Sequence, residues 1–234
     1  MTEALDEGLL AALQAVDTPT ICNAIEIVKD SRQNSGFTRL PVVAADPGLP
    51  AMVGYARCVR IRAAEPPSDP PDAVRDRRHA YYGYVVSPPA PTVVVLEDAD
   101  WPDCAGAFWG EVNVAIHKGL GVAGALTNGT LRDLGMLDGG FQVLAGSIGP
   151  SHAFVHVTAL DVPVAVLGLE IRPGDLIHAD RHGAVVIEPE VLPELPRAID
   201  LTVRREKPIL AAARAPGFTV EKLRRAWADA DDVH

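Results

Sequence analysis

The segment from Trp109 to Asp133 holds the residues whose types and spacing best suit chemistry. Gly110 and Glu111 stand where a helix is predicted to begin, and Arg132 and Asp133 follow the next predicted strand. Adjacent crossover elements of an α/β sheet bring such ends together at one edge. We therefore expect the two segments to form a pocket.

The predicted helix start suits a small carboxylate. Backbone N–H groups around Glu111, Val112 and Asn113 have no partner within the helix, and the positive end of the helix dipole lies beside them. Gly110 lets the backbone approach a ligand closely. We predict that these four residues bind the substrate together with Arg132.

Arg132 and Asp133 would add two further functions to this pocket. The guanidinium of Arg132 is a planar, permanently charged group that pairs with a carboxylate or a polarised carbonyl oxygen. The carboxylate of Asp133 is a hard oxygen ligand suited to Mg²⁺. From spacing alone, a solvated charge pair at a helix start is the alternative interpretation.

The elements that must position these residues form an α/β alternation, which predicts one scaffold with short connections. The expected order is a strand at 92–96, a helix near 107–118, a strand at 122–127, a short helix near 130–137 and a strand at 141–145.

Other elements are expected on either side. Thr18 and Pro19 predict the start of a helix, preceded by a shorter helix at 3–15. Interspersed arginines predict an edge or half-buried strand over 54–61. Four prolines within 65–72 predict a loop or a flap. Further expected elements are strands at 152–157 and 162–167, a hairpin over 176–187 that turns at 180–183, and helices from 189 onward, the last capped by Thr219 and ending near Ala228.

The composition predicts one large globular domain and excludes several functional classes. The chain has 234 residues, 48% of them hydrophobic, and a formal charge of −10. This charge favours neither nucleic acid nor an anionic membrane as a partner, and no apolar run approaches the roughly 20 residues of a spanning helix. The N-terminal residues lack signal-peptide features, so we expect a cytoplasmic protein. Three widely spaced cysteines predict neither a disulfide framework nor a thiolate metal site.

Several histidines are candidate metal ligands. His178, Asp180 and His182 alternate along a predicted strand, where they would share a face. The alternative is a hairpin whose turn contains His182 and is formed in part by Asp180. The segment around His79 carries three arginines and three tyrosines and is expected to be a solvated helix face, with contact to an acidic substrate or a partner subunit as the alternative. The remaining candidates, expected at the surface or at an interface, are His117, His152 and His156.

Four segments together resemble one known family. They read W-G-E-V-N from 109, G-L-G-V-A-G from 119, L-T-N-G-T-L-R-D from 126 and P-G-D-L-I-H-A-D-R-H-G-A-V-V-I from 173. In this order they resemble the RraA / 4-hydroxy-4-methyl-2-oxoglutarate (HMG) aldolase family. The interval from Glu111 to Arg132 and Asp133 is similar to the signature of its class II pyruvate aldolases.

The resemblance implies a fold and residue roles. The fold would be a swivelling-type α/β/α domain with a central sheet and flanking N- and C-terminal helices, assembled as a homotrimer or homohexamer with sites between subunits. The backbone of Val112 and Asn113 would hold the carboxylate of pyruvate, and Arg132 would face its keto oxygen. Asp133 would ligate a divalent metal, Mg²⁺ or Mn²⁺, and Glu111 would act through a water on that metal.

The implied activity is that of a metal-dependent lyase. Cleavage of a 4-hydroxy-2-oxo acid and decarboxylation of oxaloacetate both pass through the pyruvate enolate, which Arg132 and the metal would stabilise. The alternative is a non-catalytic protein-binding regulator, as in the branch of the family that inhibits ribonuclease E. A methyltransferase ranks last, because the sequence has no G-x-G-x-x-G nucleotide fingerprint.

Three positions depart from the family's pattern. Glu111 stands where catalytic members carry aspartate, Asn128 replaces an aspartate, and Met136 occupies a place that is often acidic. These changes remove or displace charge around the predicted pocket but leave its pyruvate and metal anchors in place.

Overall fold

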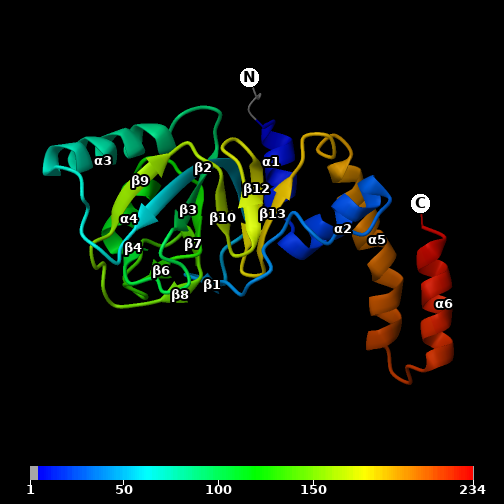
Figure 1. Ribbon diagram of the computed structural model, residues 1–234. Helices are drawn as coiled ribbons and strands as arrows, with labels where there is room; N and C mark the ends of the chain where they lie inside the picture. The colour runs from blue at the N-terminus through cyan, green and yellow to red at the C-terminus, as the bar shows by residue number, and fades with distance from the viewer. Residues whose placement is uncertain (1–4, 234) are drawn as a thin grey trace. The chain divides into compact units, whose positions relative to one another are not determined.

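The computed structural model describes residues 5–233, and the chain divides into two compact units (Figure 1). The first unit comprises residues up to 18 together with 34–188, and the second comprises 19–33 together with the chain from 189 onward. A single domain over 1–234, with N-terminal helices in 1–30 and a helical extension over 190–234, stays a prediction.

An eight-stranded sheet forms the centre of the first unit. Strands β7, β5, β3 and β2 run parallel in this order, and the other pairings are antiparallel. The predicted α/β class with a central sheet and flanking helices is therefore confirmed. The strands in spatial order are β1 (Val43–Ala44), β7 (Gln142–Ala145), β5 (Gly124–Thr127), β3 (Thr92–Asp98), β2 (Met52–Arg62), β12 (Leu176–Asp180) and β13 (Gly183–Ile187), with β9 (His156–Leu160) also paired to β2.

β2 lies in the middle of the sheet and not at its edge. It pairs with β3, β12 and β9, and nearly all of its residues are buried. The prediction of an edge or half-buried strand over 54–61 is therefore wrong. Arg57 is only 4% exposed, and its guanidinium donates hydrogen bonds to the carbonyl oxygens of Ser87 and Pro89. These carbonyl oxygens satisfy the hydrogen-bonding groups of the buried Arg57 side chain, which the sequence pattern predicts to face solvent.

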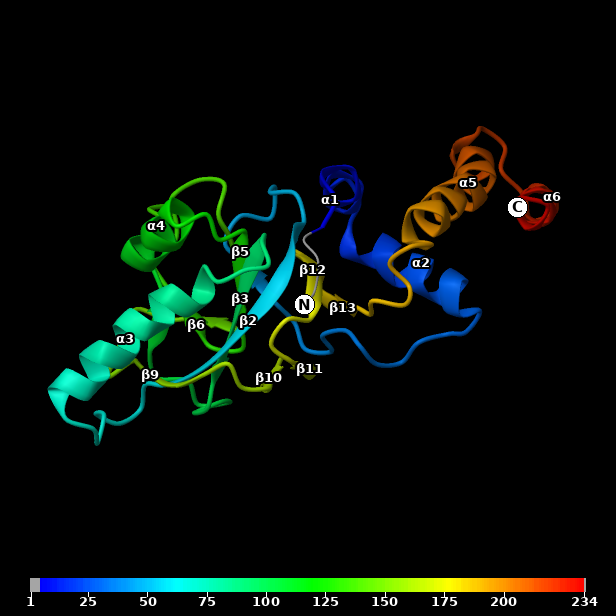
Figure 2. The same ribbon diagram turned by 90° about the horizontal axis from the view of Figure 1, so that it is seen from above.

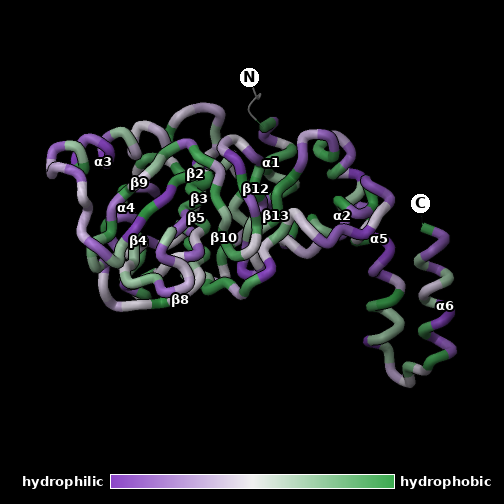
Figure 3. The backbone as a smooth tube through the Cα atoms, viewed as in Figure 1, coloured by the Kyte–Doolittle hydropathy of each residue, from purple (hydrophilic) through white to green (hydrophobic). Residues whose placement is uncertain are grey.

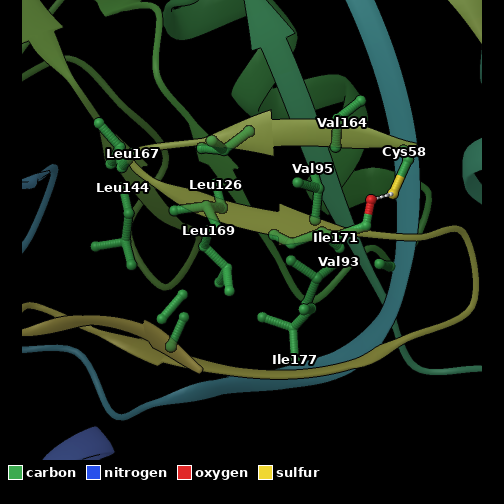
Figure 4. Packing of buried hydrophobic residues seen from close by; sticks show 14 of the residues in the cluster. Cys58, Val93, Val95, Leu126, Leu144, Val164, Leu167, Leu169, Ile171 and Ile177 are labelled. Carbon is green, nitrogen blue, oxygen red and sulfur yellow. Dashed lines mark hydrogen bonds between the residues drawn. The ribbon is translucent and has the colours of Figure 1, made fainter. Parts of the chain in front are cut away.

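Side chains of the sheet alternate between two hydrophobic cores on its opposite faces. On β3, Val93 and Val95 join one core, and Val94 and Leu96 join the other. The strands of this sheet are rich in hydrophobic residues (Figure 3). The hairpin of β10 (Val164–Val166) and β11 (Leu169–Ile171) closes the first core (Figure 4). Helices α3 (Pro71–Val85) and α4 (Glu111–Gly119) cover the second (Figure 2).

A second, three-stranded sheet connects to the helix start that was predicted to bind a ligand. It consists of β4 (Ala107–Trp109), β6 (Thr130–Leu131) and β8 (Ser147–Ile148), all parallel. The helix expected near 107–118 is found as α4 and begins at Glu111, because residues 107–109 form β4. The prediction of a short helix near 130–137 is wrong. Pairing with β4 and β8 holds 130–131 extended, and a turn follows.

The other predicted elements are found with shifted bounds. The hairpin over 176–187 is confirmed, and the strand expected at 162–167 is the shorter β10. A strand over 152–157 is wrong, since the chain is irregular up to β9. The predicted helix at 3–15 appears as α1 (Glu7–Gln14), and residues 3 and 4 lie outside the described residues.

The second unit is helical. It contains most of α2 (Thr18–Lys29), together with α5 (Leu195–Arg214) and α6 (Val220–Asp231). Thr219 caps α6 as predicted, because its hydroxyl accepts a hydrogen bond from the N–H of Lys222 at 3.3 Å. Among the helices of the described chain, none has the length and apolar character needed to cross a membrane.

Candidate active site

The small sheet brings the two predicted site segments together. β4 and β6 pair in parallel with Trp109 opposite Leu131, so the residues that follow both strands lie side by side. The N–H of Arg132 donates to the carbonyl oxygen of Trp109 at 3.0 Å. Gly110 and Arg132 therefore meet at one edge, as the sequence predicts for a pocket.

The carboxylate of Asp133 contacts both sides of this junction. Its Oδ2 atom accepts a hydrogen bond from the N–H of Glu111 at 3.1 Å and lies 3.3 Å from Nε of Arg132. A Cβ atom on Gly110 would lie 2.5 Å from the same Oδ2, so any other residue there would require the Asp133 side chain to shift. Asp133 itself has a left-handed backbone with φ of 57°, a conformation that aspartate adopts more readily than most residues.

The start of α4 has unpaired donors beside this carboxylate. Gly110 is the N-cap residue and offers no capping side chain, and the N–H of Glu111 already binds Asp133. The N–H groups of Val112 and Asn113 have no hydrogen-bond acceptor among the residues that the structure describes. Two oriented amides at the positive end of a helix are thus available to an anion.

A cleft of about 560 Å³ opens at this junction. Its walls include every predicted site residue except Glu111, namely Gly110, Val112, Asn113, Arg132 and Asp133. Glu111 is exposed, and only its backbone N–H is engaged with the cleft through Asp133. The cleft continues along α3, along the irregular segment 152–155 and along the first residues of β9.

Helix α3 supplies a wall of the cleft that the sequence predicted only as an alternative, since the segment around His79 was expected to be a solvated helix face. Val74, Arg78 and Tyr82 line the cleft at intervals of four residues, which is the spacing of one helix face. The hydroxyl of Tyr82 donates to Oδ1 of Asn113 at 3.3 Å, and Nδ2 of Asn113 donates to the carbonyl oxygen of Phe108 at 2.6 Å. The spacing was visible in the sequence, but nothing local to it indicates that this face meets α4.

His117 lies behind the cleft, fully buried, so its predicted place at the surface or an interface is wrong. Its ring packs among aromatic side chains, with its centroid 4.7 Å from that of Trp109 and 5.5 Å from that of Tyr81. Nδ1 lies 2.6 Å from the carbonyl oxygen of Asn113 and must donate to it, so Nε2 accepts from the Tyr81 hydroxyl. Burial lowers the pKa of His117 from 6.5 to about 4.

We expect this buried histidine to make stability fall in acid. Above pH 6.5, the pKa of histidine in the unfolded chain, His117 is neutral in both states and the folded state keeps its full free energy of unfolding. As the pH falls from 6.5 toward about 4, the unfolded chain binds a proton that buried His117 does not, and the free energy of unfolding decreases. The shift corresponds to a loss on the order of 3 kcal/mol. Urea unfolding of the parent and of His117→Gln at pH 7.5 and 4.5 measures it: the variant should lose less stability between these pH values.

The exposed His79 provides a matched control for this experiment. His79→Gln should keep the parent's pH dependence. His178 has a pKa lowered by burial and contributes with the same sign in all three proteins, so it cancels in the comparison. Equal pH dependence in the parent and in His117→Gln would contradict the assignment.

The histidine pattern of the hairpin is structural. Both ring nitrogens of His178 are engaged, with Nδ1 3.0 Å from the Thr18 hydroxyl and Nε2 3.0 Å from the Leu13 carbonyl oxygen. Asp180 accepts from the N–H groups of Thr18 and His182. The hairpin interpretation is therefore confirmed. No cluster of three or more histidine, cysteine or acidic side chains suited to a metal occurs among the described residues.

Two positions that depart from the family's pattern, Asn128 and Met136, lie outside the cleft wall. Asn128 joins the ends of β3 and β5, since its side chain accepts from the N–H of Asp98 at 2.7 Å and donates to the Asp98 carbonyl oxygen at 3.1 Å. Met136 is 63% exposed on the turn after Asp133. Neither side chain is part of the cleft wall. His152 and His156, by contrast, line the cleft and are partly exposed to solvent.

The sequence of the chain is similar to one protein family and to individual known proteins. The family model described as RraA-like, Aldolase/RraA, matches residues 14–186. A protein of Halalkalibacterium halodurans named "Putative 4-hydroxy-4-methyl-2-oxoglutarate aldolase" is 32% identical over 100 residues, which are 42% of this chain and 47% of that protein. Protein DlpA of Legionella pneumophila is 27% identical over 157 residues, which are 64% of this chain and 24% of DlpA. The chain thus spans about half of the first relative and about a quarter of the second.

Solved structures share the fold. An uncharacterized protein from Pseudomonas syringae pv. tomato has a TM-score of 0.70 and 21% identity, with 96% of each chain covered. Streptomyces coelicolor RraAS2, described as an unusual member of the RNase ES inhibitor RraA protein family, has a TM-score of 0.65 and 24% identity, with 92% of this chain and all of that chain covered.

Proposed function

The chain belongs to the Aldolase/RraA family, and from this premise we propose that it is a divalent-metal-dependent lyase that cleaves a 4-hydroxy-2-oxo acid to release pyruvate. The family includes HMG aldolases as well as ribonuclease E inhibitors. The observation that carries the proposal is the convergence of two unpaired amides, a guanidinium and a carboxylate on one cleft. A surface that only binds a protein does not require that arrangement.

The donor set fits Mg²⁺ or Mn²⁺ held by Asp133. Oδ2 of Asp133 is engaged by Glu111 and Arg132, while Oδ1 accepts no hydrogen bond among the described residues. Mg²⁺ commonly binds through one or two carboxylates, its substrate and several waters, so one carboxylate beside an open cleft suffices. When bound, the cation would supply Lewis-acid stabilisation of negative charge on the substrate.

The chain's own groups would orient the substrate and stabilise the charge that develops on it. The amides of Val112 and Asn113 would bind the 2-oxo acid carboxylate, and the guanidinium of Arg132 would donate to the keto oxygen. When the C3–C4 bond breaks, its electron pair passes into the enolate, whose oxygen the fixed charge of Arg132 stabilises. Because Arg132 is held by Asp133, little reorganisation accompanies this step.

Proton movement would fall to Glu111. Cleavage requires loss of the proton of the C4 hydroxyl and gain of a proton at C3 of the enolate. The carboxylate of Glu111 is exposed beside the cleft and would reach the substrate through an intervening water. Decarboxylation of oxaloacetate forms the same enolate without the first proton transfer, so one site would serve both reactions.

We further propose that the cleft lies at the interface of a homotrimer or homohexamer. Large apolar side chains surround Arg132 and Asp133 and are between 45% and 70% exposed. Apolar surface of this kind marks sites of association. These side chains are Val112, Leu134, Met136, Ile148 and Phe154.

Pyruvate release from oxaloacetate tests the proposal most directly. A coupled dehydrogenase reads the pyruvate, with Mg²⁺ and again with excess chelator, after subtraction of the reaction that the metal alone catalyses. We expect turnover that the chelator abolishes and that added Mg²⁺ restores. A folded protein with no turnover above the metal's background would instead favour the protein-binding alternative.

A further inference from the structure

The cleft is larger than the pyruvate unit requires. Its volume of about 560 Å³ lies in the range of cavities that hold ligands much larger than a three-carbon acid. Arg132 and the start of α4 form one wall, and α3 forms another. The lining also includes apolar side chains, among them Phe108, Phe154 and Val157, which suit the carbon chain of a longer substrate.

Arg78 is the unpaired cation of the α3 wall. It lies on the same helix face as Val74 and Tyr82, which also line the cleft. Its neighbours on α3 are neutralised, since Arg75 pairs with Asp72 at 2.8 Å and Arg77 with Asp69 at 2.8 Å. Arg78 makes neither an ion pair nor a hydrogen bond with any residue that the structure describes.

The other charges of the cleft favour an anion near Arg78. Asp133 is the single acidic side chain in the wall, and it is already paired with Arg132. His152 and His156 line the cleft as well, and their Nδ1 atoms lie 2.7 and 2.8 Å from the backbone oxygens of Ala153 and Phe154, to which they donate. In a chain with a net charge of −10, this cleft is a local concentration of basic groups.

We propose that Arg78 binds a second carboxylate at the far end of the substrate and so selects 2-oxo diacids over 2-oxo monoacids. The inference rests on the proposed function for the position of the first carboxylate. Arg78 would be a specificity-determining residue, because it contacts the carboxylate attached to C4 and not the keto oxygen where the enolate charge develops. A guanidinium binds a carboxylate through two parallel hydrogen bonds, which a methyl group in that position would leave unmade.

The test compares two substrates that differ at this end. Arg78→Met should lower kcat/KM for 4-hydroxy-2-oxoglutarate about 10- to 100-fold, the loss expected for a charge-assisted hydrogen bond, and leave kcat/KM for 4-hydroxy-2-oxopentanoate within about twofold. Arg78→Lys should restore part of the preference. Arg75→Met is the matched control on the same helix, outside the cleft wall, and should alter neither value.

Binding separates this inference from the proposed function. Calorimetric titration with pyruvate and with 2-oxoglutarate should show that Arg78→Met weakens only the 2-oxoglutarate complex. If the parent binds both acids with this pattern but cleaves no substrate, the lyase proposal fails and the role of Arg78 stands. The role of Arg78 would be overturned if Arg78→Met weakened the binding of both acids equally or of neither, or if the parent bound neither acid. A changed sedimentation coefficient in Arg78→Met would also overturn it, because it would indicate that Arg78 pairs with a second copy of the chain.

Discussion

Asp133→Ala is expected to reduce metal-dependent pyruvate release at least about 1000-fold, the largest effect of any single substitution in the chain. The carboxylate is the proposed metal ligand, and loss of Lewis-acid stabilisation costs several kcal/mol in the transition state, at tenfold in rate for each 1.4 kcal/mol. The same Oδ2 atom fixes the N–H of Glu111 and Nε of Arg132. Its removal therefore releases both the metal and the groups beside it.

Two companion variants separate chemistry from folding. The left-handed backbone at position 133 suits asparagine better than alanine, so Asp133→Asn keeps the turn while removing the charge. We expect Asp133→Asn to unfold like the parent and still lose metal-dependent turnover. His182→Ala changes the exposed turn of the β12–β13 hairpin and should leave turnover nearly unchanged. An active Asp133→Asn variant would exclude Asp133 as the metal ligand.

Arg132→Ala should lower kcat about 100- to 1000-fold, the usual cost of removing a donor that faces a developing oxyanion. Steady-state kinetics with oxaloacetate at saturating Mg²⁺ measures it. The larger loss should appear in kcat and not in KM, because the enolate charge exists only after the bond begins to break. A variant that raised KM alone would show that Arg132 binds only the ground-state substrate.

The double variant tests whether the two residues act as a unit. Arg132 and Asp133 are in contact at 3.3 Å, so their effects should not add. We expect Arg132→Ala combined with Asp133→Ala to be little worse than Asp133→Ala alone. Fully multiplicative losses would indicate that each residue works independently, which the shared Oδ2 contact does not favour.

The sequence predicts the junction of the site better than its surroundings. The two segments meet as predicted, but through strands that the sequence did not predict. The expected strand before Arg132 was 122–127, whereas the short strands β4 and β6 pair in parallel and bring Gly110 and Arg132 to one edge. The wall formed by α3 depends on a contact between Tyr82 and Asn113, which are 31 residues apart. No local pattern reports such a contact.

Errors in the fold arose where distant partners override local preference. The segment 130–137 resembles a helix locally, but two-sided pairing with β4 and β8 holds Thr130 and Leu131 extended. Arg57 indicates an edge strand until the carbonyl oxygens of Ser87 and Pro89, some 30 residues away, are known to accept from it. His117 looks like a surface residue because its acceptor and donor come partly from another helix.

Gly110 has a consequence for how this protein can evolve. Any side chain there would place a Cβ atom 2.5 Å from Oδ2 of Asp133, so the carboxylate would have to shift and disturb its contacts with Arg132 and the N–H of Glu111. Every substitution at this position therefore introduces the same close contact with Asp133, whatever the chemistry of the new side chain. A lineage that kept the fold but gave up the reaction would be free to accept alanine or serine at position 110, which makes this glycine a marker for sorting active from inactive descendants.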